Sequence, residues 1–276
     1  MHPKISIITV TLNSEKTLEQ TISSVVNQTY DNIEYIIIDG GSTDGTLDII
    51  HKYEKNIAYL ISEPDHGIYE AFNKGVRAAT GDYIEIIGSD DCLCNYDIIR
   101  QVAECLDGNI DILSCCQWAV EENTGYQRLL TNYSARNKRT YVGGMIPHGS
   151  MFVKKEVLEK YPFDESYKIS ADYKFFLSAY YDSNILIKYS DIAVLFFSAN
   201  GISSNIAVCE EDKRIVKELR LPDSFAKDNR SVWKKNVRAI LGEMGIYSII
   251  KKIKDRLVLE RHQCNNRICR WCGRGV

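Results

Sequence analysis

The stretch GDYIEIIGSDDCL, residues 81 to 93, joins an apolar strand pattern to two adjacent carboxylates. Its large apolar residues predict a strand buried in the protein interior: Tyr83, Ile84, Ile86 and Ile87. Asp90 and Asp91 follow this run almost at once. Unpaired charges at the end of a buried strand cost free energy, so we expect a cationic partner to meet them.

Strand and helix patterns alternate along the chain before this stretch. Continuous apolar runs predict strands at 5–10, 34–40 and 57–63. Apolar residues at helical spacing predict three intervening helices, marked by Leu18, Ile22, Val25 and Val26, by Leu47, Ile49, Ile50 and Tyr53, and by Ile68, Phe72, Val76 and Ala79. This order predicts an α/β fold with a Rossmann-like, mostly parallel central sheet flanked by helices.

Polar residues follow the predicted strands at their carboxyl ends, where α/β sheets bind ligands: Asn13, Asp39, Asp44, Asp90 and Asp91. Asp39 can accept hydrogen bonds from a nucleobase or a ribose, although a plain strand-to-helix turn is the structural alternative. The spacing is neither GxGxxG nor Walker A, so the usual NAD and ATP sites are not indicated.

Asp90 and Asp91 suit a hard divalent cation, Mg²⁺ or Mn²⁺. Such a cation takes one or two protein carboxylates and completes its shell with water and phosphate oxygens. A helix N-cap or a turn is the alternative, because Asp is common at both.

The second half predicts further strands at 111–120 and 192–205, a strand passing into a short helix within 149–166, and a helix at 170–181. Residues 226–276 form a basic tail with the pattern of two amphipathic helices. Residues 227–276 contain 13 Lys/Arg against 4 Asp/Glu, which leaves the body with a net charge of −12.

An acidic body argues against nucleic-acid binding, whereas the basic tail suits an anionic membrane surface or packing on the body. His262, Cys264, Cys269 and Cys272 form a candidate zinc site within the tail, with a frayed terminus as the alternative. Nine cysteines do not predict a disulfide scaffold, and we expect the protein to reside in the reducing cytosol. The first residues predict a strand rather than a signal peptide, and no run approaches the ~18 apolar residues of a membrane span.

Three segments of the sequence resemble the family 2 inverting glycosyltransferases with the GT-A fold. They are ISIITVTLNSEKTLEQTISSVVNQTYDNIEYIIIDGGSTDGT (5–46), SEPDHGIYEAFNKGVRAATGDYIEIIGSDD (62–91) and HGSMFVKKEVLEKYPFDESYKISADYKFFL (148–177). The resemblance runs almost without a gap from Ile5 to Leu93 and resumes at 148–177, which together make up close to half of the chain. The resemblance implies a nucleotide-sugar-binding half at 1–95 and an acceptor-binding half at 96–225 of one GT-A domain. The tail at 226–276 lies outside the resemblance.

Residue roles follow from the resemblance by position. It implies that Asp172 is the catalytic base and that Asp91 binds Mn²⁺ or Mg²⁺ at the donor diphosphate. It implies a place for His148 near the acceptor or diphosphate. The remaining implied donor-binding residues are Thr11, Asn13 and Glu15 around the nucleotide, Asp39 at the uracil, Asn73 and Lys74 near the donor sugar or diphosphate, and Asp90 at the ribose or donor sugar.

One position departs from the family pattern. Many relatives carry an Arg ahead of the Asn in the segment before the acidic pair, whereas here Phe72 precedes Asn73 and Lys74. If diphosphate binding depends on a cation there, Lys74 or Arg77 must supply it.

The expected activity is single-displacement, metal-assisted transfer of a hexosyl or N-acetylhexosaminyl group from a UDP-sugar. The expected acceptor is a hydroxyl of a glycan or a lipid-linked oligosaccharide in polysaccharide biosynthesis. A sugar nucleotidyltransferase and a non-catalytic nucleotide-sugar-binding scaffold are the alternatives. We expect a cytoplasmic protein, with peripheral contact to the inner membrane face and a homodimer as further candidates.

Overall fold

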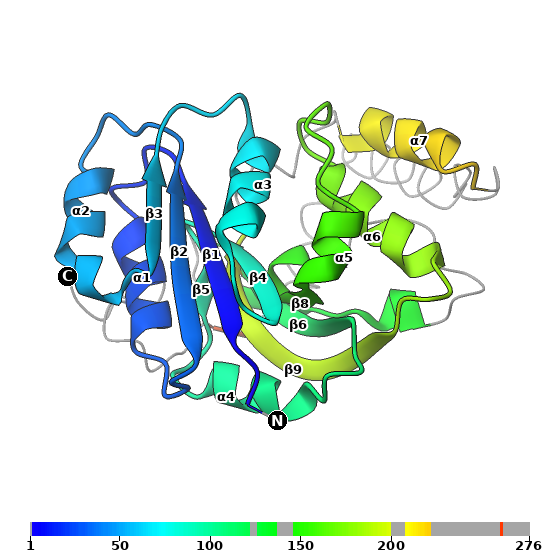
Figure 1. The fold of residues 1–276 in the computed structure, drawn as a ribbon, viewed down its shortest axis with the longest axis horizontal. Helices are drawn as coiled ribbons and strands as arrows, with labels where there is room; N and C mark the ends of the chain where they lie inside the picture. Colours follow the sequence, from blue (N-terminus) through cyan, green and yellow to red (C-terminus); the bar gives the residue numbers. More distant parts are fainter. Residues whose placement is uncertain (1, 122–125, 137–145, 200–207, 222–259, 262–276) are drawn as a thin grey trace, which may run out of the picture.

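The computed structural model describes residues 2–121, 126–136, 146–199, 208–221 and 260–261. Within these residues the strands form one mixed sheet with helices on both faces (Figure 1). The sheet order is β10-β7-β6-β8-β4-β1-β2-β3, and β9 pairs with both β5 and β6. The predicted α/β class is therefore confirmed.

The first half of the chain builds the parallel part of the sheet. Its strands are β1 (Ile5–Thr11), β2 (Ile33–Asp39), β3 (Tyr59–Ser62) and β4 (Tyr83–Gly88), all mutually parallel where they pair. Thr11 pairs with Asp39 and Val10 pairs with Gly88, so three strand ends lie at one edge. This register brings the polar residues that follow each strand together.

Helices cover the two faces of this parallel part. They are α1 (Leu18–Val26), α2 (Thr46–Lys52), α3 (Ile68–Ala78) and α4 (Ile98–Cys105), with a 3-10 turn η1 (Glu54–Asn56) after α2. Figure 1 shows α1 and α2 to one side of the strands and α3 to the other. The three helices before β4 are those that the apolar spacing predicts.

Side-chain alternation along β1 divides the core into two layers. Ile5 and Ile7 pack with α1, α2 and α4, whereas Ile8 and Val10 pack with α3 and the later helices. A strand presents alternate residues to opposite faces, so a continuous apolar run fits a strand that is covered on both sides.

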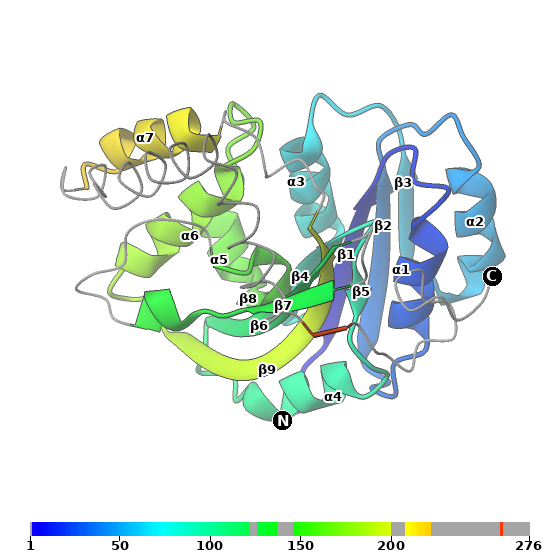
Figure 2. The same cartoon turned by 180° about the vertical axis from the view of Figure 1, so that it is seen from behind.

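The second half extends the sheet with mixed pairing. Its strands are β5 (Cys92–Leu93), β6 (Ile112–Val120), β7 (Tyr126–Leu130), β8 (Met151–Lys154), β9 (Ile187–Ser198) and β10 (Glu260–Arg261). Its helices are α5 (Lys155–Lys160), α6 (Ala171–Tyr181) and α7 (Val208–Glu218), with the 3-10 turns η2 (Tyr133–Arg136) and η3 (His148–Ser150). The long strand β9, which belongs to the same sheet, is strongly curved in both views (Figure 2). It runs parallel to β6 and antiparallel to β5, which follows the acidic pair.

A buried carboxylate holds the amino ends of the strands together. Glu34 accepts hydrogen bonds from Lys4 Nζ at 2.7 Å, Ser6 Oγ at 2.6 Å and the Thr80 backbone N–H at 2.7 Å. Its side chain is 10% exposed. Burial alone raises the pKa of Glu34, but these donors outweigh it and lower the pKa to about 2.

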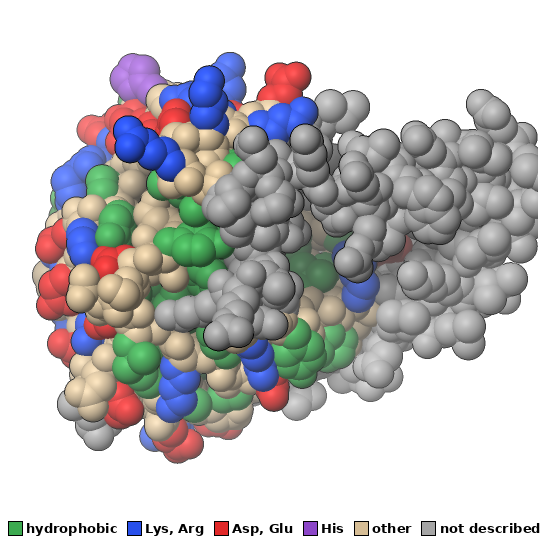
Figure 3. All heavy atoms as spheres, turned by 90° about the vertical axis from the view of Figure 1, so that its right-hand side faces the viewer, with side chains coloured by type: hydrophobic (Ala, Val, Ile, Leu, Met, Phe, Trp, Pro, Cys, Tyr) green, Lys and Arg blue, Asp and Glu red, His purple; other side chains and the backbone are tan. Residues whose placement is uncertain are grey.

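The basic tail at 226–276 lies outside the described residues apart from 260–261, as does the candidate zinc site. Across the described ranges, no helix combines the length and apolarity needed to cross a bilayer. On the described face in Figure 3, acidic and basic side chains are interspersed around grouped hydrophobic ones. That face therefore shows no continuous basic stripe of the kind that nucleic-acid binding favours.

Candidate active site

The loops after β1 and β2 are joined by hydrogen bonds that two predicted donor-binding residues make. Asn13, whose φ of 50° is left-handed, donates its backbone N–H to Ser42 Oγ at 2.8 Å. Its Oδ1 accepts the Thr43 N–H at 2.9 Å, and Glu15 Oε2 accepts the Gly45 N–H at 3.0 Å. Asn13 and Glu15 thus shape the strand-end loops.

Asp39 is fully buried at the end of β2. Its carboxylate accepts hydrogen bonds from Ser42 Oγ at 2.5 Å and Ser62 Oγ at 2.7 Å, and from the N–H groups of Ser42 and Gly41. A ligand N–H would have to replace one of these hydroxyl donors. Beside it, Thr11 Oγ1 is buried and has no hydrogen-bond partner among the described residues.

Asp90 and Asp91 stand where β4 ends, and both line one cavity. Asp91 is 5% exposed, with Oδ2 accepting the Gly88 N–H at 3.1 Å and Oδ1 accepting the Ser198 N–H at 3.3 Å. Backbone donors thus fix the orientation of the Asp91 carboxylate.

The acidic pair fits a cation that substrate phosphates complete. Within the described ranges, no cluster of three or more His, Cys, Asp or Glu side chains could hold a metal by itself. Mg²⁺ and its relatives are commonly held by one or two carboxylates together with substrate phosphates, rather than by an all-protein cage. Two adjacent carboxylates on the wall of a cavity match that donor set.

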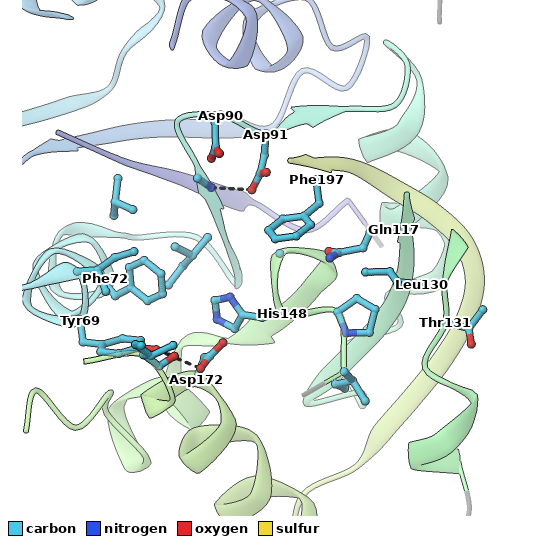
Figure 4. A pocket seen from close by; sticks show the side chains of 18 of the residues that line it. Tyr69, Phe72, Asp90, Asp91, Gln117, Leu130, Thr131, His148, Asp172 and Phe197 are labelled. Atoms are coloured by element: carbon cyan, nitrogen blue, oxygen red, sulfur yellow. Dashed lines mark hydrogen bonds between the residues drawn. The ribbon is translucent and has the colours of Figure 1, made fainter. Parts of the chain in front are cut away.

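The cavity has a volume of about 600 Å³, within the usual size of small-molecule sites. Figure 4 shows Asp90 and Asp91 on one side of it and Asp172 on the opposite side, with His148 between them. Residues from both halves of the chain line the cavity. The first half contributes Val10 and Gly88 at the strand ends and Ile68, Tyr69 and Phe72 on α3. The second half contributes Gln117 on β6, Arg128 and Leu130 on β7, Phe197 on β9, Lys168 and Ile169 just before α6, and Asp172 on α6.

Asp172 lies in the first turn of α6 and contacts a tyrosine of α3. The Tyr69 hydroxyl lies 3.1 Å from Asp172 Oδ1 and 2.5 Å from the Ile169 carbonyl oxygen. Burial raises the pKa of Tyr69, and the Asp172 charge raises it further, so Tyr69 stays protonated and donates. The Tyr69 hydroxyl carries one proton, which it shares between the Ile169 carbonyl oxygen and Asp172 Oδ1, and so it lies against one oxygen of this carboxylate.

His148 packs face to face on Phe72, with ring centroids 5.6 Å apart and an interplanar angle of 2°. Burial lowers the pKa of His148, although the nearby Asp172 charge opposes that shift. The imidazole is therefore neutral at neutral pH, so it can both donate and accept a hydrogen bond at the cavity wall.

Asn73 and Lys74 do not line this cavity. Asn73 bridges α3 to the backbone of Phe163, with its Nδ2 2.8 Å from the Phe163 carbonyl oxygen and its Oδ1 3.1 Å from the Phe163 N–H. Lys74 Nζ lies 2.9 Å from Glu63, 2.5 Å from Asp65 and 3.1 Å from Glu70. These contacts are structural, so the donor-binding roles of both residues stay predictions.

Gln117 is a cavity residue that the sequence patterns did not single out. It is 5% exposed, and its Oε1 lies 3.4 Å from Ser150 Oγ. A Cβ on Gly149 would lie 2.8 Å from Leu195 Cδ2, which is too close, and 3.7 Å from Gln117 Oε1, so close packing on Leu195 favours a glycine beside Gln117. The feature of the sequence that could have identified Gln117 is an amide side chain within the apolar run DILSCCQWAV.

Glu85 lies on β4 with its carboxylate turned away from the cavity, on the face of Tyr83 and Ile87. It is fully buried, and neither oxygen has a hydrogen-bond partner among the described residues. Burial raises the pKa of Glu85 well above its usual range, and the Asp91 charge adds to the rise. Glu85 is therefore a neutral acid beneath the acidic pair.

The sequence profile described as Glycosyl transferase family 2 matches residues 6–162. An uncharacterized glycosyltransferase of Mycobacterium tuberculosis is 31% identical over 180 residues, which make up 64% of this chain and 69% of the relative. A PGL/p-HBAD biosynthesis glycosyltransferase of Mycobacterium bovis is 28% identical over 229 residues, 79% of this chain and 84% of the relative.

Solved structures share the fold at lower identity. S. aureus TarS 1-349 in complex with UDP-GlcNAc aligns with a TM-score of 0.60 at 21% identity over 77% of this chain. The mannosyltransferase PcManGT from Pyrobaculum calidifontis, in complex with GDP-Man and Mn²⁺, aligns with a TM-score of 0.61 at 20% identity over 80% of this chain. This chain spans 64% and 65% of those two chains. The protein therefore has the GT-A fold and belongs to glycosyl transferase family 2, a family of glycosyltransferases.

Proposed function

We propose that the protein is an inverting glycosyltransferase that moves a hexosyl or N-acetylhexosaminyl group from a UDP-sugar to an acceptor hydroxyl. The observation that carries this proposal is the placement of carboxylates on opposite walls of one cavity. Asp90 and Asp91 lie at the strand ends, where α/β sheets bind nucleotides, and Asp172 lies across from them. A donor and an acceptor could meet in the space between.

Asp172 is the proposed base. Its Oδ1 faces the Tyr69 hydroxyl, and its carboxylate reaches the cavity. A carboxylate there takes the proton from the acceptor hydroxyl as that oxygen attacks the anomeric carbon. A single attack opposite the leaving diphosphate inverts the anomeric centre, and it requires no carboxylate nucleophile beneath the sugar.

The donor residues act by binding and orientation. Asp39 would accept an N–H of uracil, and Thr11, Asn13 and Glu15 would shape the pocket around the nucleotide. Asp90 would contact the ribose or donor sugar, and His148 would face the acceptor or the diphosphate. Asn73 and Lys74 would support the donor side through α3.

Asp91, with Asp90 beside it, would hold Mn²⁺ or Mg²⁺. When bound, the cation neutralises charge that develops on the departing diphosphate. Two structural relatives, PcManGT and a glucosyl-3-phosphoglycerate synthase of Mycobacterium tuberculosis, have structures in complex with Mn²⁺. That likeness supports a divalent cation without selecting between the two metals.

The proposed acceptor is a glycan or a lipid-linked oligosaccharide. We place the enzyme in the cytoplasm, with the basic tail at 226–276 against an anionic membrane face and a homodimer as the candidate assembly. The charge contrast between tail and body supports the membrane contact.

A donor screen tests the proposal. Purified protein is incubated with a panel of UDP-sugars and Mn²⁺ or Mg²⁺, and UDP release is measured for wild type and Asp91→Asn. We expect metal-dependent release from one donor, reduced at least about 100-fold in Asp91→Asn because the cation loses its best-oriented carboxylate.

Asp107→Asn is the matched control, because Asp107 is an exposed turn residue outside the cavity. Equal losses in both variants would contradict the assignment of Asp91. Absence of both turnover and UDP binding in wild type would contradict the UDP-sugar assignment and point to another nucleotide or to a scaffold role.

A further inference from the structure

A single carboxylate of α7 binds three consecutive backbone N–H groups just before α6. Glu211 accepts hydrogen bonds from Lys168 at 2.9 Å, Ile169 at 3.0 Å and Ser170 at 2.8 Å. We name residues 168–170 the α6 loop. Burial alone raises the pKa of Glu211, but the three donors outweigh it and lower the pKa below its usual value. Glu211 is therefore an anion held in a nest of N–H groups.

The α6 loop is part of the cavity wall and leads directly to Asp172. Lys168 and Ile169 line the cavity, and Asp172 follows in the first turn of α6. Ile169 is bound from both sides, because its N–H donates to Glu211 and its carbonyl oxygen accepts from Tyr69. The position of the Asp172 carboxylate therefore depends on a segment that is hydrogen-bonded to the side chains of both Glu211 and Tyr69.

Without Glu211, three neighbouring N–H groups would lose their acceptor together. The hydrogen bonds from Ile169 and Ser170 are partly buried, and a donor that is left without a partner there costs free energy, so the loop would change conformation to satisfy these two groups. Ser170 precedes α6 at the N-cap position but makes no side-chain cap hydrogen bond.

Other contacts attach α7 to the body. Glu218 lies 2.6 Å from Lys174 Nζ and 2.8 Å from the Tyr167 hydroxyl, and Ile215 is fully buried. α7 is thus attached to the body by contacts in addition to those of Glu211. The three hydrogen bonds of Glu211 act on the loop, which argues for a role beyond helix packing.

We propose that Glu211 is a positioning residue that fixes the α6 loop so that Asp172 faces the cavity. This inference rests on the proposed role of Asp172 as the base. It also assigns a task to α7, which lies beyond the segment matched by the family profile. The three N–H groups require one carboxylate as their acceptor. A small free carboxylate ion can therefore take its place once the Glu211 side chain is removed.

The test compares Glu211→Ala and Glu211→Gln with Glu218→Gln in the full chain. Glu218 is the matched control, because it lies on the same helix and accepts hydrogen bonds from the side chains of Tyr167, Lys174 and Arg214 but from no backbone N–H of the α6 loop. Three properties are measured: amide hydrogen exchange of residues 168–170, kcat of sugar transfer or donor hydrolysis, and the Kd of UDP with Mn²⁺.

We expect faster exchange at 168–170 in Glu211→Ala and no change in Glu218→Gln. The kcat of Glu211→Ala should fall about 100-fold, since small misplacements of a reacting group cost about that much, while the Kd of UDP stays within about 2-fold. The kcat of Glu211→Gln should lie between those of wild type and Glu211→Ala, because the amide keeps one acceptor oxygen but loses the charge. Added formate should restore part of the kcat of Glu211→Ala and none of any loss in Glu218→Gln.

Unchanged exchange at 168–170 in Glu211→Ala overturns the inference. So does faster exchange with unchanged kcat, or a kcat loss that formate leaves as it is. The exchange measurement does not depend on turnover. If wild type transfers no sugar, the proposed function fails at Asp172, and exchange alone shows whether Glu211 holds the loop.

Discussion

The hydroxyl of Tyr69 lies 3.1 Å from Asp172 Oδ1, across a separation of 103 residues in the chain. Tyr69 belongs to α3 in the half that carries the strand ends, and Asp172 belongs to α6 in the other half. One hydrogen bond thus links the two walls of the cavity.

Tyr69→Phe should lower kcat about 10-fold and leave the Kd of UDP unchanged, because it removes one hydrogen bond to a charged group worth about 1.5–3 kcal/mol. The ring keeps its stacking on Phe163, so folding should be retained. Steady-state kinetics and calorimetry with UDP check this. Tyr53→Phe is the control, since Tyr53 contacts Glu19 away from the cavity. A UDP affinity that falls in parallel with kcat would contradict the assignment.

Gln117→Leu should raise the KM for one substrate at least about 10-fold, because a site built to hydrogen-bond a hydroxyl loses binding when its amide is removed. The amide is 5% exposed and lies at the cavity beside Gly149. Kinetics with donor and acceptor varied separately identify which substrate is affected. Gln20→Leu changes another buried glutamine outside the cavity and should leave both KM values unchanged. Unaltered KM values in Gln117→Leu would rule out substrate contact.

Lys74→Met should lower the free energy of unfolding by about 2–3 kcal/mol, because it leaves clustered carboxylates without their cation. The Lys74 side chain is 9% exposed, and that of its partner Asp65 is 11% exposed. Chemical denaturation measures the change. Lys52→Met is the control. Lys52 Nζ lies 3.6 Å from Glu19 Oε1 in an exposed ion pair, which should contribute little to the free energy of unfolding. A weakened UDP affinity with unchanged stability would instead support a direct donor role for Lys74.

Glu34→Gln should destabilise the protein by about 2 kcal/mol at neutral pH, because charge-assisted hydrogen bonds from three residues are lost. The folded-state pKa of Glu34 is about 2, below its usual value of 4.5. Its contribution is therefore fully present above pH 4.5 and is lost as the pH falls toward 2. Unfolding at several pH values should show the wild-type advantage shrinking across that window, whereas Glu54→Gln, at an exposed residue of η1, should show no such change.

Glu85→Gln should be more stable than wild type at neutral pH. The folded-state pKa of Glu85 is raised above 4.5, so the folded protein binds this proton more tightly than the unfolded chain. Wild-type stability therefore falls as the pH rises above 4.5, and the amide variant escapes that cost. Denaturation at pH 4 and pH 7 checks the sign. An advantage for Glu85→Gln that is equal at both values would contradict a neutral Glu85.

Strand ends were predictable because the parallel register follows from local patterns. Apolar runs place Asp39 and Asp90 at carboxyl ends, and parallel pairing then brings them to one edge. Asp172 and His148 came from the family resemblance, since periodicity alone does not distinguish a base from a helix N-terminal Asp.

Tyr69 and Glu211 were not predictable, for a physical reason. Tyr69 sits within an amphipathic helix pattern, where an aromatic residue reads as core, and its hydroxyl partner is distant in the sequence. Glu211 binds backbone N–H groups, which leave no mark in the side-chain sequence. Lys74 had a visible signal, since Glu63, Asp65 and Glu70 shortly precede it in the sequence, but only the fold shows them meeting one cation.

The pairing of β5 with β9 also has a consequence for the order of events on the ribosome. Asp91 accepts the N–H of Ser198, which is synthesised 107 residues later, and Cys92 pairs with Phe196. Contacts of such long sequence separation form late, because loop closure must precede them. A nascent chain that has emerged only through β8 therefore carries the acidic pair without its second backbone donor. The emergence of β9 is then the step at which a growing polypeptide can form the hydrogen bond between the Ser198 N–H and Asp91.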